Sequence, residues 1–320
     1  MATKRICLQN GGFCKNPAVS RNTRNRAPCN RIVLIILWSV LTRRNAIIQL
    51  FQDDDPETVR LVKEQLAQGG REIVDELEEL VAEPDLTVSQ HATEVLHTVL
   101  QQDAKEDLTL LCFFFDDTHN LEHICWTLSR CIQPEVDTRP YKALIKDWGR
   151  KFLLRSSEAI SSRERVTKLV QFVHDELGFC GNTDEYYSEK NSLLPWVINM
   201  RRGIPISLTL LYMFIAERAG MKVSGVNLPG HFIAKHGSVF FDPYNAGKFL
   251  DRADCEKILC SQRLALSDRH LEPATPRQIF IRMLVNLLYL YDLQGNREKY
   301  SQINSWLQVL TNPFLNPRRR

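Results

Sequence analysis

The stretch from Arg201 to Asn245 constrains the fold more than any other part of this 320-residue chain. Gly203 and Pro205 stand where a helix would begin, because a proline in the first turn has no amide hydrogen to lose. From Ile206 to Ala219 the apolar residues are too dense for a surface helix, so we expect a helix that is buried on most sides. Gly220 then ends it, as a left-handed C-cap would.

Three short β-prone runs follow this helix: Val223 to Val226, His231 to Ala234 and Val239 to Phe241. Pro229-Gly230 separates the first two runs and Lys235-His236-Gly237 the last two, and both separators are typical of turns. The stretch therefore predicts a mainly helical α+β fold with a central helix and a small antiparallel sheet.

These residues resemble the transglutaminase-like superfamily, whose core has the papain-type fold. Within it, the chain is similar to the SirB-type family of bacterial proteins, which carry a tetratricopeptide-like tail. The resemblance is strong from about residue 160 to 311, weaker from 46 to 150, and absent from the first 44 residues. The matching residues are Arg202 to Leu208, Pro229-Gly230-His231-Phe232, Phe241-Asp242-Pro243-Tyr244-Asn245, Leu177-Gly178-Phe179, Gly181-Asn182, Tyr186 and Tyr187.

The chain departs from the active members of that superfamily at one position. Active members place a cysteine at the start of the central helix, whose N-terminus helps to stabilise the thiolate, with a histidine on one strand and an aspartate on the next. The resemblance matches His231 and Asp242 to the last two, but Pro205 takes the cysteine position and has no nucleophilic atom. The resemblance to the SirB-type branch implies that this loss is usual there. It leaves a remnant dyad that either orients a general base or acts as a polar clamp between two strands.

Two other side chains are candidates for the missing nucleophile. Cys180 lies in a predicted loop from Gly178 to Pro195, but a loop thiol lacks the helix N-terminus that would lower its pKa. Ser207 lies two positions beyond Pro205, which turns it about 200° around the helix, so we expect it to cap the helix start. The resemblance implies further cleft residues: Asn182, Tyr186, Tyr187 and Asn245.

Residues 1–44 differ from the rest of the chain. They hold nine Lys and Arg and no acid. Because the whole chain has a net charge of only +3, residues 45–320 carry a net negative charge, which does not suggest a nucleic-acid surface. Their apolar run, Ile32 to Leu41, is half of what a bilayer span needs, and no small-residue cleavage site follows it. Three interpretations stay open: a start codon assigned too far upstream, a disordered basic arm, or a poor targeting segment. We expect a cytoplasmic protein without a membrane span.

Nine cysteines without CxxC pairs argue against a disulfide framework and for a reducing compartment. A zinc site from His119, His123, Cys125 and Cys131 is an alternative, but their spacing matches no recognised ligand pattern. We therefore expect Cys125 and Cys131 to be small buried residues of a helix, and we expect no metal or cofactor.

Helical periodicity flanks the core on both sides. From Asn45 to about Leu154 it predicts short paired helices, similar to a HEAT-type repeat, including separate helices that carry Val88 to Val99 and Leu108 to Phe115. After the core we expect helices at Asp251 to Leu259, Pro276 to Tyr291 and Asn296 to Leu310. Within them, Arg282–Leu293 and Arg297–Leu310, joined by Gln294-Gly295-Asn296, resemble one tetratricopeptide-like hairpin. It would stack on the core through Leu284, Leu287, Leu288, Tyr289, Trp306 and Leu307.

The sequence thus predicts an extension (1–44), a HEAT-like helical domain (45–154), a transglutaminase-like core (155–275), a tetratricopeptide-like hairpin (276–311) and a basic tail (312–320). Two functional hypotheses follow. The first is a non-catalytic scaffold that binds a protein or peptide partner. The second is an amide-bond hydrolase or acyl transferase that uses His231 and Asp242 with a non-standard nucleophile or an activated water.

Overall fold

A computed structural model describes residues 43–115 and 121–312. The apolar run Ile32 to Leu41 and His119 lie outside the described residues. The chain divides into two compact units, residues 1–49 and 50–320, and in the first the described residues 43–49 are helical. Among the described residues, no helix combines the length and hydrophobicity that a membrane crossing requires.

Unit 50–320 begins with helices that pack on one long helix. Asp55 caps α2 (Pro56–Ala67) by accepting from the backbone of Glu57 and Thr58, as its sequence predicts. A 3-10 turn (Gly70–Ile73) leads into α3 (Val74–Val81), and α2 and α3 both pack on α4 (Leu86–Phe113).

The prediction of two helices within residues 86–115 is wrong, because α4 is one continuous helix of 28 residues. Its polar middle contains no glycine or proline, and Ala104 continues the buried stripe from Val99 to Leu108. The charged residues between Ala104 and Leu108 therefore lie on the solvent-facing side of α4 and do not form a linker between two helices.

The middle of the chain is helical and leads to the core. It comprises α5 (Leu121–Ile132), α6 (Arg139–Ser156), α7 (Ser162–Val170) with a π-helical turn (Gln171–Glu176), and α8 (Leu194–Met200). The segment Gly178 to Pro195, predicted as one loop, includes short regular elements. It contains β1 (Cys180–Gly181) and a 3-10 turn (Glu189–Ser192), and α8 begins at Leu194 with Pro195 in its first turn, where proline is favourable.

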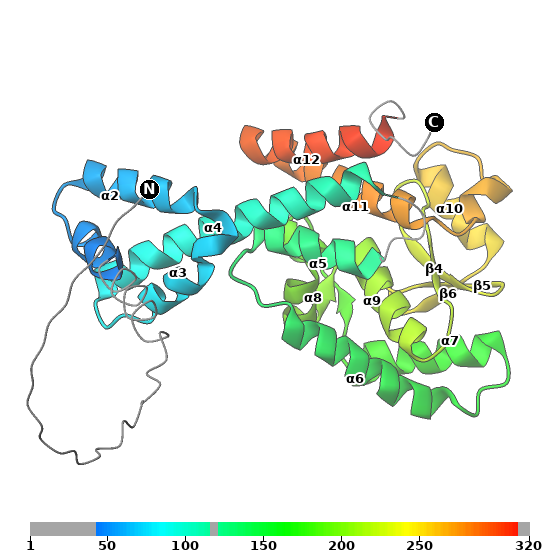
Figure 1. The fold of residues 1–320 in the computed structure, drawn as a ribbon. Helices are drawn as coiled ribbons and strands as arrows, with labels where there is room; N and C mark the ends of the chain where they lie inside the picture. The colour runs from blue at the N-terminus through cyan, green and yellow to red at the C-terminus, as the bar shows by residue number, and fades with distance from the viewer. Residues whose placement is uncertain (1–42, 116–120, 313–320) are drawn as a thin grey trace, which may run out of the picture. The chain divides into compact units, whose positions relative to one another are not determined.

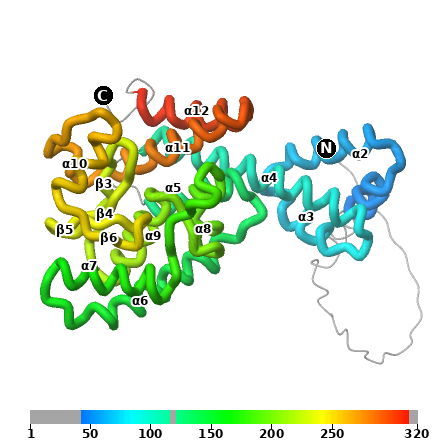
Figure 2. Tube along the Cα trace, turned by 180° about the vertical axis from the view of Figure 1, so that it is seen from behind, coloured from blue at the N-terminus to red at the C-terminus, as the bar shows by residue number. Residues whose placement is uncertain are grey.

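The central helix α9 (Pro205–Arg218) has most of its 14 residues buried, and Gly220 follows it with φ 69°, so both features predicted from the sequence are confirmed. β1 pairs in parallel with β2 (Arg202–Gly203), just before α9. Four antiparallel strands follow in the order β3 (Ser224–Val226), β4 (Ile233–His236), β5 (Val239–Asp242) and β6 (Lys248–Leu250), as labelled in Figures 1 and 2.

Two details of the sheet correct the sequence reading. Lys235 and His236 belong to β4, so the turn before β5 is confined to Gly237 and Ser238, where Gly237 takes φ 58°. The second predicted strand starts at Ile233 rather than at His231, which leaves His231 in the loop that enters β4.

The C-terminal segment consists of α10 (Arg252–Ser261), a 3-10 turn (Asp268–Leu271), and the neighbouring helices α11 (Pro276–Leu293) and α12 (Arg297–Thr311). Trp306 of α12 is buried and its Nε1 donates to Thr109 Oγ1 of α4 at 2.9 Å. The predicted packing of Tyr289 on the core is wrong, since its side chain is 57% exposed on α11. The described structure is therefore mainly helical, with two small sheets.

Candidate functional site

The start of α9 is closed by its own residues. Pro205 is buried in the first turn, and the Ser207 hydroxyl accepts from the backbone nitrogen of Ile204 and donates to its carbonyl, both at 3.1 Å. Ser207 is fully buried, and a Cβ at Gly203 would lie 2.7 Å from its Oγ. The predicted capping role of Ser207 is confirmed, and its hydroxyl is engaged there.

The structure brings His231 and Asp242 together. His231 Nε2 lies 2.7 Å from Oδ2 of Asp242, the last residue of β5. The same Oδ2 accepts from Asn245 Nδ2 at 2.7 Å, while Oδ1 accepts the backbone N–H of Tyr244 at 3.0 Å and of Asn245 at 3.3 Å. Burial raises the pKa of Asp242, but the hydrogen bonds from His231 and Asn245 outweigh it, so the pKa stays below its ordinary value. An ionised Asp242 then accepts, and His231 carries a proton on Nε2.

The other ring nitrogen of His231 has a different environment. Among residues 43–115 and 121–312, no thiol or hydroxyl forms a hydrogen bond with Nδ1, and 16% of the side chain is exposed. The ring of Tyr244 lies 6.3 Å from the His231 ring, edge to face. Cys180 lies in β1, where its backbone nitrogen donates to Arg201 O at 3.0 Å, and no hydrogen bond joins its thiol to His231 within the described residues. Neither Cys180 nor Ser207 therefore completes a triad with this histidine.

Tyr244 joins the dyad to the loop that follows β1. Its hydroxyl donates to Asn182 O at 3.2 Å, and a Cβ at Gly181 would lie 2.8 Å from the carbonyl oxygen of Tyr244. Asn182 is buried, donates from its backbone to Gly203 O at 2.9 Å and from its side chain to Asn191 Oδ1 at 2.9 Å. The candidate Asn182 thus anchors this loop beside the start of α9.

A row of tyrosine rings extends from the dyad to α11. We call it the tyrosine row, and it comprises Tyr244, Tyr186, Tyr187 and Tyr289. Successive ring centroids lie 6.1, 5.3 and 6.4 Å apart. Tyr186, Tyr187 and Tyr289 are 41%, 64% and 57% exposed. The two predicted tyrosines therefore belong to a surface that starts at His231.

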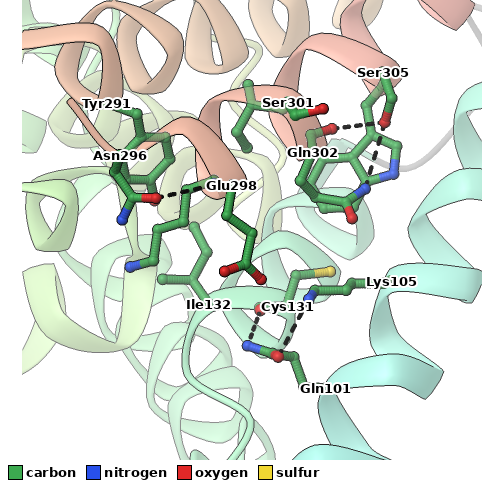
Figure 3. A pocket seen from close by; sticks show the side chains of 13 residues that line it. Gln101, Lys105, Cys131, Ile132, Tyr291, Asn296, Glu298, Ser301, Gln302 and Ser305 are labelled. Carbon is green, nitrogen blue, oxygen red and sulfur yellow. Dashed lines mark hydrogen bonds between the residues drawn. The ribbon is translucent and has the colours of Figure 1, made fainter. Parts of the chain in front are cut away.

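A separate pocket of about 540 Å³ is bordered by α4, α5 and the α11–α12 hairpin, without any member of the dyad or the tyrosine row (Figure 3). Gln101 donates to Cys131 O at 3.1 Å, and Lys105 donates to the Gln101 amide oxygen at 3.2 Å. Burial raises the pKa of the Cys131 thiol to about 12 and that of Cys125 still higher. Both are buried residues of α5, as expected, and the described residues contain no cluster of three metal-ligating side chains.

Sequence reasoning missed three residues at the site. Tyr244 was visible within the motif Phe241 to Asn245 but was not selected as a candidate. Asn191 and Arg282 carried no signal, because Asn191 lies in a short 3-10 turn without a motif and Arg282 lies on α11, far along the chain. Arg282 Nη1 donates to Asn227 Oδ1 at 3.2 Å, in the loop that carries His231.

Comparison with known proteins indicates the type of domain that carries this site. Residues 139–285 match the model of the transglutaminase-like superfamily, so the chain contains a transglutaminase-like domain. A UPF0162 protein of Xylella fastidiosa (strain 9a5c) is 31% identical over 187 residues, which cover 55% of this chain and 66% of that protein. A UPF0162 protein of Pseudomonas aeruginosa is 31% identical over 140 residues, 42% of this chain and 51% of that protein. Human F-box only protein 21 is 28% identical over 168 residues, 47% of this chain and 26% of that protein. No solved structure matches the chain.

Proposed function

We propose that this protein is a non-catalytic, SirB-type transglutaminase-like protein that binds a protein or peptide partner, with His231 and Asp242 serving as a polar clamp. The observation that carries the proposal is the start of α9. Pro205 offers no nucleophile there, and the hydroxyl of Ser207, two residues along, is engaged in the helix cap.

The bonds of Asp242 support a structural role for the dyad. Its carboxylate accepts from one histidine, one asparagine side chain and two backbone amides. These bonds tie the loop after β5 to the loop before β4. A buried carboxylate with this many donors stabilises the local fold whether or not a reaction takes place.

The flanking helices and the relatives support a binding role. We propose that α2 to α4 form a HEAT-like segment and that α11 and α12 form a tetratricopeptide-like hairpin, both of which are elements used to present binding surfaces. The matched region makes up 26% of human F-box only protein 21, so a related domain also occurs as a part of a larger protein. We place this protein in the cytoplasm, because the six cysteines within the described residues are free thiols, as a reducing compartment favours.

One observation favours the enzyme as a second candidate. Asp242 binds Nε2 of His231, and Nδ1 forms no hydrogen bond within the described residues, which is how a general base is oriented. Such an enzyme would hydrolyse or transfer an amide bond with an activated water or a thiol that approaches from the loop, with Cys180 as the candidate.

The decisive test looks for a covalent acyl intermediate and for turnover. The full chain is incubated with acyl-donor esters and a peptide library, and intact-protein and peptide masses are recorded, with Cys180→Ser and His231→Ala as companions. We expect no adduct and no cleaved or transferred peptide in any sample. An adduct that the wild type forms and Cys180→Ser lacks would establish the enzyme instead, as would turnover that His231→Ala abolishes.

A further inference from the structure

We propose that the tyrosine row and Arg282 together form a docking surface for an acidic peptide segment of a partner protein. Arg282 binds a carboxylate of that segment, and the exposed tyrosines contact the apolar side chains beside it. This inference rests on the proposed binding function and specifies the chemistry of the partner.

Arg282 is a cation without an acidic partner among the described residues. It lies half-buried on α11, the described residues give it one hydrogen bond, to Asn227, and burial lowers the pKa of its guanidinium. A guanidinium offers five N–H donors in a planar fork that matches a carboxylate in two parallel hydrogen bonds. Removing such a charge from water is costly unless an anion compensates it.

One acidic side chain that packs on α11 is already engaged by other donors. Glu189 lies beside α11, where it accepts from the Tyr291 hydroxyl at 2.6 Å and from Lys299 Nζ at 2.8 Å. Arg282 interacts instead with Tyr186, whose pKa is raised chiefly by burial and lowered in part by the Arg282 charge. The position therefore suits an acid that another molecule supplies.

The exposed rings lie next to this cation. Tyr289 lies seven residues beyond Arg282 on α11, two helical turns along the same face, and Val285 lies between them and is 41% exposed. Tyr187 packs against Tyr289, with ring centroids 6.4 Å apart, and continues the row back to Tyr186. Tyrosine and arginine are the residues that most often anchor protein interfaces, because they combine a large contact area with polar tips.

The charge of Arg282 indicates which segment can bind this surface. The chain's own ends are basic: residues 1–44 carry nine Lys and Arg and no acid, and residues 318–320 are all arginine. Neither end complements Arg282. An acidic segment that also carries apolar side chains complements both the cation and the rings, so we assign the surface to such a segment.

The test measures charge preference directly. Two fluorescein-labelled pools of nine-residue peptides, with a central Glu or a central Gln and Leu, Phe and Tyr flanks, are titrated with the full chain by fluorescence anisotropy. We expect the Glu pool to bind about tenfold more tightly, as two charge-assisted hydrogen bonds provide. Arg282→Gln removes this preference, Arg282→Lys keeps part of it, and Tyr187→Ala weakens both pools equally.

Controls keep the result specific. Arg150→Gln removes an exposed arginine on α6 that pairs with Asp147 at 2.6 Å, and it leaves the preference unchanged. Circular dichroism melts confirm that each variant is folded. If Arg282→Gln does not fold, the reduced preference of Arg282→Lys for the Glu pool is the result that is compared with the wild type. A wild type that binds both pools equally overturns the proposal, as does an Arg282 variant that retains the full preference.

Two further outcomes separate this inference from the proposed function. If size-exclusion chromatography shows a dimer that Tyr187→Ala dissociates, a second copy covers the surface and the proposal of an acidic segment is wrong. The peptides are also recovered and weighed by mass spectrometry. Cleaved or transferred peptides would refute the non-catalytic function and leave the role of Arg282 standing, whereas intact peptides bound without charge preference would refute only the docking surface.

Discussion

Replacing Asp242 by alanine tests whether the dyad holds the fold together. The side chain is 3% exposed and accepts four hydrogen bonds, from His231, Asn245 and the backbone nitrogens of Tyr244 and Asn245. Asp242→Ala removes all four and leaves the His231 ring without its partner.

The expected loss follows from those contacts. Hydrogen bonds to a charged group contribute about 1.5–3 kcal/mol each, but Tyr244 is half-buried and Asn245 exposed, so their donors regain water on substitution. The hydrogen bond from His231 is better shielded than these, so its full contribution and the cost of an unsatisfied donor set the scale for the remainder. We expect Asp242→Ala to lower the free energy of unfolding by about 4 kcal/mol and the Tm by roughly 10 °C.

Urea unfolding at several pH values measures this loss. Because the folded-state pKa of Asp242 lies below its ordinary value, its ionised form contributes stability that is fully present above the unfolded pKa of about 4. That contribution is lost as the pH falls through the folded pKa. The difference between wild type and Asp242→Ala is therefore constant near pH 7 and shrinks below about pH 4.

Asp268→Ala is the matched control. Asp268 is 88% exposed and forms one ion pair, with Arg252 at 2.7 Å, so its loss costs less than about 1 kcal/mol. If Asp242→Ala costs no more than Asp268→Ala, or if its effect does not change with pH, the clamp does not stabilise the fold and this reasoning is refuted.

Three further substitutions test the surroundings of α9. Ser207→Ala removes the hydroxyl that accepts from the Ile204 N–H at the helix start, so we expect a loss of about 1 kcal/mol in urea unfolding, and an unchanged midpoint would contradict it. Gly181→Ala places a Cβ 2.8 Å from the Tyr244 carbonyl oxygen, so we expect a loss of about 2 kcal/mol and a changed near-ultraviolet circular dichroism spectrum, which a wild-type spectrum would refute. Pro205→Cys restores a thiol at the helix N-terminus. Iodoacetamide should alkylate it faster than in the double variant with His231→Ala, and equal rates would show that His231 does not face this position.

The sequence indicated those elements whose ends carry local chemical signals. Pro205 and Gly220 mark α9, and Asp55 marks α2, because a cap or a left-handed residue acts within one turn of the chain. α4 was misread as two helices because its polar middle resembles a linker, and only the packing of Ala104 in the core shows that the helix continues.

The site was predictable to the extent that its residues fall in short motifs. His231, Asp242 and Asn245 lie within two such motifs, and the structure brings all three into one hydrogen-bonded group. Tyr289 was expected in the core from helical spacing, and Arg282 was not selected. Their surroundings depend on how α11 packs beside Tyr186 and Asn227, which are distant in sequence, so no local pattern reveals them.

The contacts also explain how the dyad can persist where the nucleophile does not. A cysteine at position 205 would contribute reactivity but no bond that the fold requires, whereas proline in the first turn of α9 fits the helix start. Asp242 is different, because removing it leaves the Nε2 donor of His231, on a side chain that is only 16% exposed, without its acceptor. Loss of the cysteine at position 205 therefore costs no stability, whereas loss of Asp242 does. A protein that only binds would keep Asp242 without the cysteine.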